Sequence, residues 1–486
     1  MALRLPDAGR TMGLRWVAAK GTGKSTGLGR RLCIGDFDRD MPLIVLDPLG
    51  GTIDHFLDVL LRRPLSRRKE DGKRLRYVQM SGESGSVTPF PIYRRTPGSS
   101  LYRIAERPIE IWQRSDPTLK LGAPVQGLNA VLSIGDVVGM ILAALDWRIT
   151  EAEALLREPE RHATQLMALA QREPETQKPV AWLLDTYASF TAHEKRTQTS
   201  SYVNKVRSLT LDPTTQATYG ATQPGIDWQE VIDHKLAVLI DFRGEMSSNQ
   251  RFFGMLWIFH DLLEFIRNRK PNSPLMSLVI DELTYFVSAD PRQQDVLADD
   301  FEDLIARLAR NRRVALTVTH QELNQLTKRM GNVLMSMGTQ IFGSTSDLEG
   351  GAEVWAKRFD RYEPLKPKKV TDTLVGRNMW TTRTTELSIA EQIRIAAQEK
   401  YMNLPPFTFW GAVSQREGEL GMVPEQFTIT PDEGVNWERV EQARHLLVQR
   451  NGQPIEDVRS EIAMRTRGTE RLPSRRRKVD INTEED

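Results

Sequence analysis

The sequence predicts an α/β fold, in which a mostly parallel sheet carries an inserted all-α domain and an irregular C-terminal extension. Short apolar runs recur along the chain, each ended by acidic or turn residues, and amphipathic segments such as residues 251–269 lie between them. Buried parallel strands have this continuous apolar character, and strand alternating with helix is typical of a parallel sheet. Helical periodicity with little strand-like sequence, from about residue 101 to 210, predicts the insertion.

The expected strands follow one another along the chain, and after about residue 365 the pattern weakens. The strands are expected at residues 14–18, 42–51, 75–82, 235–242, 275–282, 314–320, 338–345 and 405–414. These positions predict a core in two parts with the helical domain between them, then a C-terminal strand with its connecting segment, and an extension that is partly disordered. The corresponding ranges are 1–100, 101–225, 226–360, 361–415 and 416–486.

Charge does not identify a partner class for the whole chain. The 486 residues include 66 Lys and Arg against 64 Asp and Glu, a net charge of +2. Basic residues do cluster at 61–76 and at 471–478. Such clusters are either solvated faces, the more common case, or contacts to nucleic acid, and both readings stay open for each.

The composition also argues against several other classes of protein. Cys33 is the single cysteine, which excludes an intramolecular disulfide and fits a reducing cytosol, and we expect it to be a small buried residue. The seven histidines have no ligand spacing with it, so a Cys and His metal site is not expected. No run of about 18 apolar residues and no signal peptide is found, so we expect a soluble, cytoplasmic protein without a membrane segment.

Residues 15–26, RWVAAKGTGKST, have the character of a phosphate-binding loop. Backbone N–H groups of such a turn wrap the phosphates, the lysine reaches the β- and γ-phosphates, and the following hydroxyl binds Mg²⁺. Ala18 stands where the G-x-x-x-x-G-K-[ST] pattern has its first glycine, and its methyl group matters only if that residue needs a positive φ. The segment therefore predicts an ATP site. Its nucleotide-binding residues would be Lys20, Gly21, Thr22, Gly23, Lys24, Ser25 and Thr26.

Two later strands end in residues that suit the same site. LVIDE delivers Asp281 and then Glu282, an aspartate that would hold Mg²⁺ through water and a glutamate that would polarise the attacking water. VALTVTHQ ends in Gln321, which in a parallel sheet lies at the same edge as the phosphate loop and could sense the γ-phosphate or orient water. We interpret the neighbouring His320 as a packing residue rather than a catalytic one.

The order of these motifs resembles the HerA/FtsK superfamily of P-loop motor ATPases. It is most similar to the TraG/TraD-type conjugative coupling proteins of type IV secretion DNA transfer and to HerA-like ATPases. The resemblance covers roughly residues 10 to 350 and implies a RecA-like P-loop NTPase core. In place of the family's D-P-x-G-D segment the chain has DPLGG, so that Gly51 replaces the final acidic residue. The motifs that carry the resemblance are GTGKST, VLDPLGG, the helical insert, KLAVLIDFRG, LVIDE, ARNRRVALTVTHQ and GTQIFGSTSD.

The resemblance also implies an assembly. Members commonly form hexameric rings that pump DNA through a central channel, with each site completed by an arginine from the neighbouring subunit. The matching arginine here is Arg310, and Arg307, Arg312 and Arg313 are close competitors. Because the chain begins near its phosphate loop, we expect a relative recruited by another protein, such as a relaxase, a nuclease or a secretion channel.

The resulting prediction is an ATP hydrolase that translocates single- or double-stranded DNA as a homo-hexamer, with ATP and Mg²⁺ as cofactors. Lys24, Glu282, Gln321 and Arg310 would be catalytic, and Ser25 and Asp281 would hold the Mg²⁺. One alternative is a HerA-like helicase or translocase paired with a nuclease. Another is a protein-secretion or scaffold ATPase that does not bind DNA.

Overall fold

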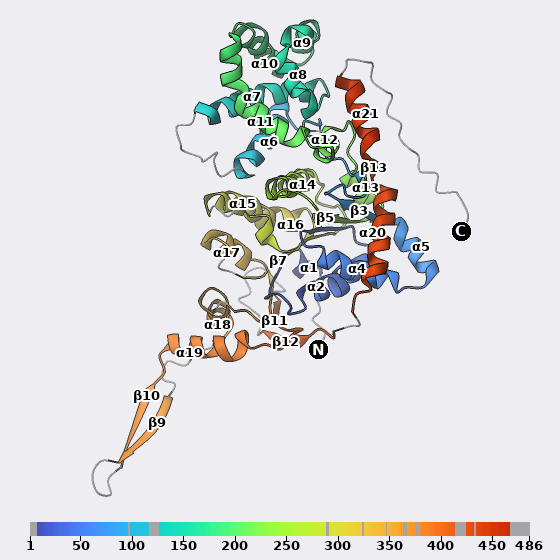
Figure 1. Cartoon of the computed structure of the whole chain (residues 1–486). Helices are drawn as coiled ribbons and strands as arrows, with labels where there is room; N and C mark the ends of the chain where they lie inside the picture. The colour runs from blue at the N-terminus through green and yellow to red at the C-terminus, as the bar shows by residue number, and fades with distance from the viewer. Residues whose placement is uncertain are drawn as a thin grey trace. The chain divides into compact units, whose positions relative to one another are not determined.

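The computed structural model of the chain (Figure 1) resolves into two compact units. Unit 1 comprises Met1–Thr88, Glu110–Pro124 and Gly225–Gly452, and unit 2 comprises Pro89–Ile109, Val125–Pro224 and Gln453–Asp486. The structure describes residues 7–95, 98–115, 126–287, 291–322, 325–346, 348–360, 362, 367–374, 380–413, 424–431 and 434–466. The basic run at 471–478 and the end of the extension, which the sequence predicts to be disordered, lie outside these residues.

Unit 1 is built on one large sheet, in which the described strands number nine. Their order across the sheet is β12-β11-β8-β1-β7-β6-β2-β5-β3. Neighbours from β8 to β3 are parallel, and β11 and β12 add antiparallel strands at one edge. The strands are β1 (Leu14–Val17), β2 (Leu43–Asp47), β3 (Leu75–Gln79), β5 (Ala237–Asp241), β6 (Met276–Ile280), β7 (Val314–His320), β8 (Thr339–Phe342), β11 (Thr408–Val413) and β12 (Glu425–Thr428).

The sheet confirms the predicted fold class and every strand expected from the apolar runs. The five central strands β1, β2, β5, β6 and β7 are buried at every position, as expected for strands covered by helices on both faces. Strand β7 lies between β1 and β6, with Val17 opposite His320 and Ile280 opposite Val318. The residues that follow β1, β6 and β7 therefore meet at one edge of the sheet.

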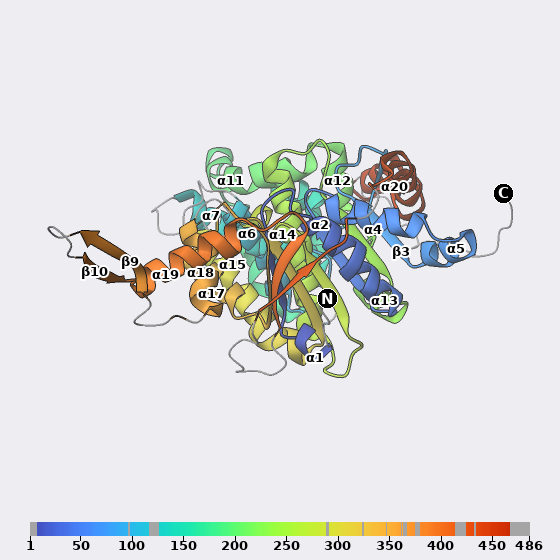
Figure 2. The same cartoon turned by 90° about the horizontal axis from the view of Figure 1, so that it is seen from below.

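Helices cover both faces of this sheet. Figure 2 shows α2 and α4 on one side of the strands and α15, α17 and α18 on the other. The helices of unit 1 are α1 (Asp7–Arg10), α2 (Lys24–Gly27), α3 (Ile34–Asp38), α4 (Gly51–Leu61), α5 (Leu65–Lys73), α13 (Trp228–Asp233), α14 (Ser248–Asn268), α15 (Pro291–Asp303), α16 (Ala309–Asn311), α17 (Lys328–Met335), α18 (Glu353–Phe359), α19 (Ile389–Ala396) and α20 (Trp437–Asn451). A short strand β4 (Ser86–Val87) and a hairpin of β9 (Pro367–Leu374) and β10 (Trp380–Glu386) complete the unit.

Helix α14 illustrates why these segments are helical. The Ser247 hydroxyl accepts a hydrogen bond from the Gln250 backbone N–H at 3.2 Å, and the Ser247 backbone N–H donates to Gln250 Oε1 at 3.1 Å, so the first turn has a capping box. Apolar residues at helical spacing, including Phe253, Leu256 and Trp257, are buried. The aromatic ring of Phe253 stacks on Trp257 with the centroids 6.2 Å apart.

Unit 2 is helical, as the periodicity of the insertion predicts. Its helices are most of α6 (Leu101–Ser115), then α7 (Gln126–Ala144), α8 (Ala152–Arg157), α9 (Ala163–Arg172), α10 (Gln177–Ala181), α11 (Ala192–Thr210), α12 (Pro213–Gly220) and α21 (Ile455–Thr466), with the short strand β13 (Gln453–Pro454). Arg465 joins α21 to the rest of the unit: its guanidinium pairs with Glu151 and donates to the Thr222 hydroxyl at 2.7 Å and to the Gly220 carbonyl at 2.6 Å. A C-terminal segment is thereby part of the helical unit.

Three features considered in the sequence can be compared with the described residues. Of the basic cluster at 61–76, Arg63 and Arg67 pair with Asp71, and Arg74 pairs with Asp40, which favours the reading as a solvated face. In the part of the chain that is described, no helix is both long enough and apolar enough to span a bilayer. Cys33 is buried, as expected.

Candidate nucleotide-binding site

The phosphate loop leaves β1 at the carboxyl edge of the sheet. Ala18 continues the strand, since its N–H donates to the His320 carbonyl at 3.3 Å, and it is absent from the positive-φ residues of the described chain. A methyl group at the first pattern position therefore causes no backbone strain. Gly21 and Gly23 have φ of +81° and +92°, the left-handed region that glycine enters readily. The two later glycines are the conformational requirement of this loop.

Phe407, far along the chain, packs against the phosphate loop. The Phe407 N–H donates to the Thr22 carbonyl at 2.8 Å, and a Cβ atom added at Gly23 would lie 2.3 Å from Cδ1 of the Phe407 ring. Phe407 itself has a φ of +62°, an uncommon conformation for an aromatic residue, and its carbonyl accepts from the Ile429 N–H at 2.8 Å. The sequence gives no signal for this contact, because the partners are almost 400 residues apart and share no motif.

Gly23→Ala should destabilise the protein more than Gly21→Ala. Both substitutions force an L-residue to a positive φ, at about 1–2 kcal/mol. Only the first meets a neighbour, because nothing lies within 4 Å of a Cβ atom at Gly21. The Phe407 contact should therefore add about 1–3 kcal/mol of overpacking, measured as the difference in unfolding free energy in urea. The double variant Gly23→Ala with Phe407→Ala should lose this extra overpacking cost. Phe407→Ala combined with Gly21→Ala should give no such gain. Equal losses in the two glycine variants would contradict the packing argument.

Three predicted side chains meet at the end of the loop. Lys24 Nζ donates to Glu282 Oε2 at 2.9 Å, and Gln321 Nε2 donates to the same oxygen at 2.9 Å. Lys24 and Glu282 are 8% and 2% exposed, so the ion pair is buried. This geometry agrees with the sequence prediction. The residues that follow β1, β6 and β7 lie at one edge of the sheet.

The backbone at Glu282 is strained in a way that aims its carboxylate. Its φ of +51° lies in the left-handed region, which costs a residue with a side chain about 1–3 kcal/mol and persists only where the surroundings enforce it. The enforcing contacts come from two threonines: the Glu282 N–H donates to Thr319 Oγ1 at 3.0 Å, and the Thr284 hydroxyl donates to Glu282 Oε1 at 2.8 Å. Such strain is typical of functional positions.

Asp281 lies next to the start of α4. Its two carboxylate oxygens accept hydrogen bonds from the hydroxyls of Thr52, at 2.7 Å, and Thr319. A Cβ atom added at Gly51 would lie 3.4 Å from Ser25 Oγ, an ordinary contact. Ser25 and Asp281 thus flank the same turn, and an acidic residue at position 51 would begin its side chain beside Ser25.

The remaining loop residues have different surroundings. Thr22 is buried and its hydroxyl donates to the Ala19 carbonyl at 2.8 Å, so it closes the turn. The Thr26 hydroxyl lies 3.2 Å from His55 Nε2, while Lys20 is exposed. Lys24 contacts the predicted base Glu282, and Ser25 lies beside Gly51, next to the Thr52 that donates to Asp281.

Further carboxylates at the same edge are absent from the sequence prediction. Asp47 and Asp241 end the adjacent strands β2 and β5 in register. Asp47 accepts backbone N–H groups of Leu49, Gly50 and Ile53 at 2.6–3.1 Å. Burial, with Asp281 and Asp241 nearby, raises the pKa of Asp47 to about 8. The available signal was the acidic residue that ends each of these two apolar runs.

Arg243 balances the next pair of acids. Its guanidinium donates to Asp54 Oδ2 at 2.6 Å and to Asp241 Oδ2, and the Tyr77 hydroxyl donates to Asp241 at 2.7 Å. Arg444 of α20 lies 3.5 Å from Asp54. These charges are internally compensated, so the cluster fixes the edge of the sheet.

The structure does not bring Arg310 to its own chain's phosphate loop. It is exposed on α16, just before β7, whereas Gln321 follows the other end of that strand. Seven residues at about 3.3 Å each separate the two edges by roughly 20 Å. Of its competitors, Arg307 pairs with Asp303 at 2.6 Å and Arg312 donates to the Arg269 carbonyl at 2.5 Å.

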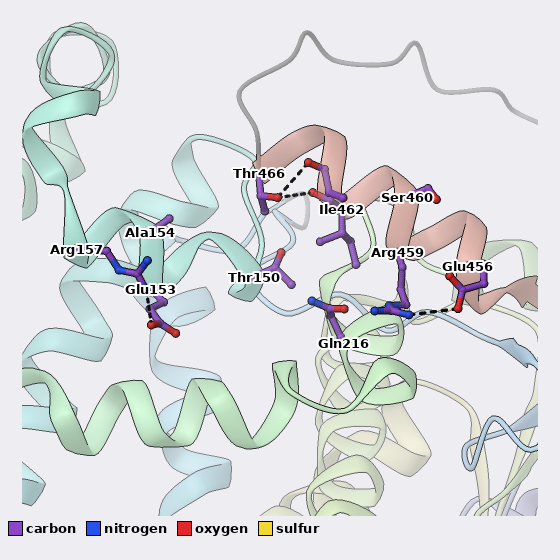
Figure 3. Close-up of a pocket in the computed structure, with 11 residues that line it drawn as sticks. Thr150, Glu153, Ala154, Arg157, Gln216, Glu456, Arg459, Ser460, Ile462 and Thr466 are labelled. Carbon is purple, nitrogen blue, oxygen red and sulfur yellow. Dashed lines mark hydrogen bonds and ion pairs between the residues drawn. The ribbon is translucent and has the colours of Figure 1, made fainter.

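A groove of about 550 Å³ in unit 2 is a separate feature (Figure 3). It is lined by residues of α8, α12 and α21, among others. Its charged side chains pair within their own helices, Arg157 with Glu153 at 2.7 Å and Arg459 with Glu456 at 3.2 Å, and Glu153 also pairs with Arg207 of α11 at 2.6 Å. Such i,i+3 and i,i+4 pairs are ordinary surface contacts, and the groove therefore adds no candidate site.

Comparisons with known proteins were made at the levels of family, sequence and structure. No family model matches the chain, and no curated protein matches it by sequence. Solved structures of the bacterial conjugative coupling protein TrwB do match. The trigonal form of TrwBdeltaN70 with sulphate has a TM-score of 0.54 at 14% identity, covering 90% of this chain and 89% of that one. TrwB in complex with ADP and Mg²⁺ has a TM-score of 0.53 at 15% identity, covering 90% and 92%.

A third TrwB structure, in complex with a non-hydrolysable ATP analogue, has a TM-score of 0.52 at 14% identity and covers 90% of this chain and 91% of that one. At these identities the likeness concerns the fold. It extends beyond residues 10–350, where the motifs carry the resemblance, to nine-tenths of the chain. The RecA-like core and the likeness to coupling proteins expected from the motif order are thus confirmed at the level of the fold.

Proposed function

We propose that this chain is a P-loop motor ATPase that hydrolyses Mg·ATP and moves DNA, in the manner of a conjugative coupling protein. The observation that carries the proposal is the buried contact among Lys24, Glu282 and Gln321 at the edge where the phosphate loop begins. Transfer of a phosphoryl group to water requires a positive charge for the phosphates and a carboxylate to activate the water, which Lys24 and Glu282 would supply. The amide of Gln321 could respond to the γ-phosphate.

The residues at this edge suit a magnesium ion. Ser25 would contribute its hydroxyl directly, and Asp281, held by the hydroxyls of Thr52 and Thr319, would hold the ion's water ligands. The ion would neutralise charge on the phosphate oxygens. Among the described residues no group of three or more His, Cys, Asp or Glu forms a complete cage.

Glu282 is the proposed base. Its carboxylate is held by Lys24, Gln321 and Thr284. When phosphates attract Lys24, one of these contacts is released, and Oε2 gains an acceptor site for a water proton. Gln321 stays on the same oxygen and would orient that water or respond to the γ-phosphate.

Glu282→Gln should separate binding from chemistry. The amide keeps the shape and an oxygen acceptor for Lys24, but it removes the base, so turnover should fall about 10²- to 10⁴-fold while bound ATP and any oligomer persist. Asp281→Asn should instead raise the Mg²⁺ concentration needed for half-maximal rate. Both rates are measured by phosphate release across a Mg²⁺ titration. Near-wild-type rates in both variants would reject this assignment of roles.

The DNA part of the proposal is supported by the fold shared with TrwB, a bacterial conjugative coupling protein. A homo-hexameric ring, a relaxase, nuclease or secretion-channel partner, and a cytoplasmic location belong to the same proposal. The test is the ATPase rate with and without single- and double-stranded DNA, alongside a mass measurement with nucleotide bound. Hydrolysis that DNA leaves unchanged, with no DNA binding, favours the secretion or scaffold ATPase.

A further inference from the structure

A fully buried arginine lies in the strand that leads to the phosphate loop. Arg15 of β1 is 0% exposed, and its Nε–H donates to His320 Nε2 at 2.9 Å. Its other contact is with Met335, and in the part of the chain that is described no carboxylate pairs with it. Burial and the nearby Arg358 lower the pKa of Arg15 to about 9. A cation is rarely buried without a carboxylate, so the hydrogen bond of Arg15 to a ring nitrogen needs an explanation.

The contact determines which nitrogen of His320 carries the proton. An arginine N–H can only donate, so Nε2 must be the acceptor and the neutral ring must be protonated at Nδ1. Burial, Arg15 and Lys24 hold the pKa of His320 well below its usual range, so the ring is neutral. Nδ1 lies 3.2 Å from the Glu322 carbonyl, and the Nδ1–H is therefore the donor to that oxygen.

The hydrogen bond from His320 Nδ1–H to the Glu322 carbonyl joins the two residues on either side of Gln321. His320 is the last residue of β7, Glu322 is two residues later, and the side chain of the residue between them donates to Glu282 at 2.9 Å. An imidazole that holds the Glu322 carbonyl fixes the turn from which Gln321 projects. We infer that His320 is a positioning residue for hydrolysis: Arg15 sets its tautomer, and its Nδ1–H fixes the turn that aims Gln321 at Glu282. This inference rests on the proposed ATPase function.

Two substitutions at position 320 separate the two contacts. Asparagine can place an N–H where Nδ1–H lies and so keep the bond to Glu322, but it is too short to reach Arg15. Glutamine can place an oxygen near Nε2 and accept from Arg15, but its amide reaches past the Nδ1 position. His320→Asn should keep a kcat close to that of wild type. His320→Gln should lose about 10- to 100-fold in kcat with little change in KM, because a misplaced group costs chemistry rather than binding.

A spectroscopic measurement tests the tautomer without ATP. The chain has seven histidines, and in protein labelled with ¹⁵N-histidine the His320 signals are those missing from His320→Asn. The ¹⁵N shifts of wild type should report a neutral ring protonated at Nδ1, and Arg15→Met should abolish that single tautomer. A wild-type ring protonated at Nε2, or doubly protonated at neutral pH, overturns the inference even if a variant fails to fold.

The kinetic and spectroscopic results distinguish this inference from the function on which it rests. A wild-type protein that hydrolyses ATP while His320→Asn and His320→Gln lose equal activity overturns the positioning role and leaves the ATPase intact. A wild-type protein without any hydrolysis overturns the ATPase and the positioning role with it, whereas the tautomer measurement still decides the Arg15–His320 contact.

Discussion

Replacing Lys24 by alanine is expected to abolish ATP hydrolysis. The Lys24 ammonium is the buried cation at the start of α2, and it would stabilise charge that develops on the γ-phosphoryl oxygens. Removing one such preorganised donor costs a factor of about 10² to 10³ in rate, and the loss of a full charge should be at least as large. Phosphate release at saturating Mg·ATP measures the effect, and binding of a fluorescent ATP analogue shows whether affinity falls as well.

Lys20→Ala is the matched control for this experiment. It removes a lysine from the same loop, but this side chain is exposed and the backbone N–H remains. Its rate should stay close to that of wild type. If the wild-type protein hydrolyses no nucleotide, with or without DNA, and Lys24→Ala changes nothing, the loop does not support an ATPase.

Arg310→Ala is expected to lose turnover while retaining ATP binding. An arginine that neutralises the transferring phosphoryl group is worth about 10³ to 10⁵ in rate, whether it comes from the same chain or from a neighbour. Arg310 lies at the start of β7, whereas its own phosphate loop lies at the edge where β7 ends. Arg310 could therefore act only on the site of another subunit. The rate per subunit should therefore rise with protein concentration.

A mixing experiment tests the shared site. Arg310→Ala and Glu282→Gln are each inactive for a different reason, and a mixed interface can combine one intact base with one intact arginine. Mixing the two variants should restore part of the activity. Arg307→Ala is the comparison variant, since that side chain lies on the same connection but pairs with Asp303. A strictly monomeric protein with a concentration-independent rate would remove the arginine and the ring from the proposal.

Most of the core could be predicted because its signals are local. Each central strand is a continuous apolar run, and parallel strands deliver their carboxyl ends to one edge, so Lys24, Glu282 and Gln321 could be brought together from sequence alone. The same logic accounts for Ala18, because a residue still in the strand has no need for the conformational freedom of glycine.

The elements that escaped prediction lack such signals. Strand β12 lies at an edge of the sheet with three exposed residues and one half-buried residue, Phe427, and helix α20 buries only two of its residues, Val440 and Val448. Their stability comes from the surfaces on which they pack. The Arg15–His320 contact is equally invisible in the sequence, because a charged residue inside a strand gives no indication of which polar group it meets.

The contact of Phe407 with the phosphate loop has a mechanical consequence. Thr22, Phe407 and Ile429 are joined in series by main-chain hydrogen bonds, and β11 and β12 form a short antiparallel ribbon beside that junction. Main-chain bonds between strands are stiff in extension, and a ring pressed against Gly23 resists compression. A displacement of the loop during the proposed ATP cycle would therefore be passed on to Phe407 and Ile429, the residues that flank the paired strands β11 and β12.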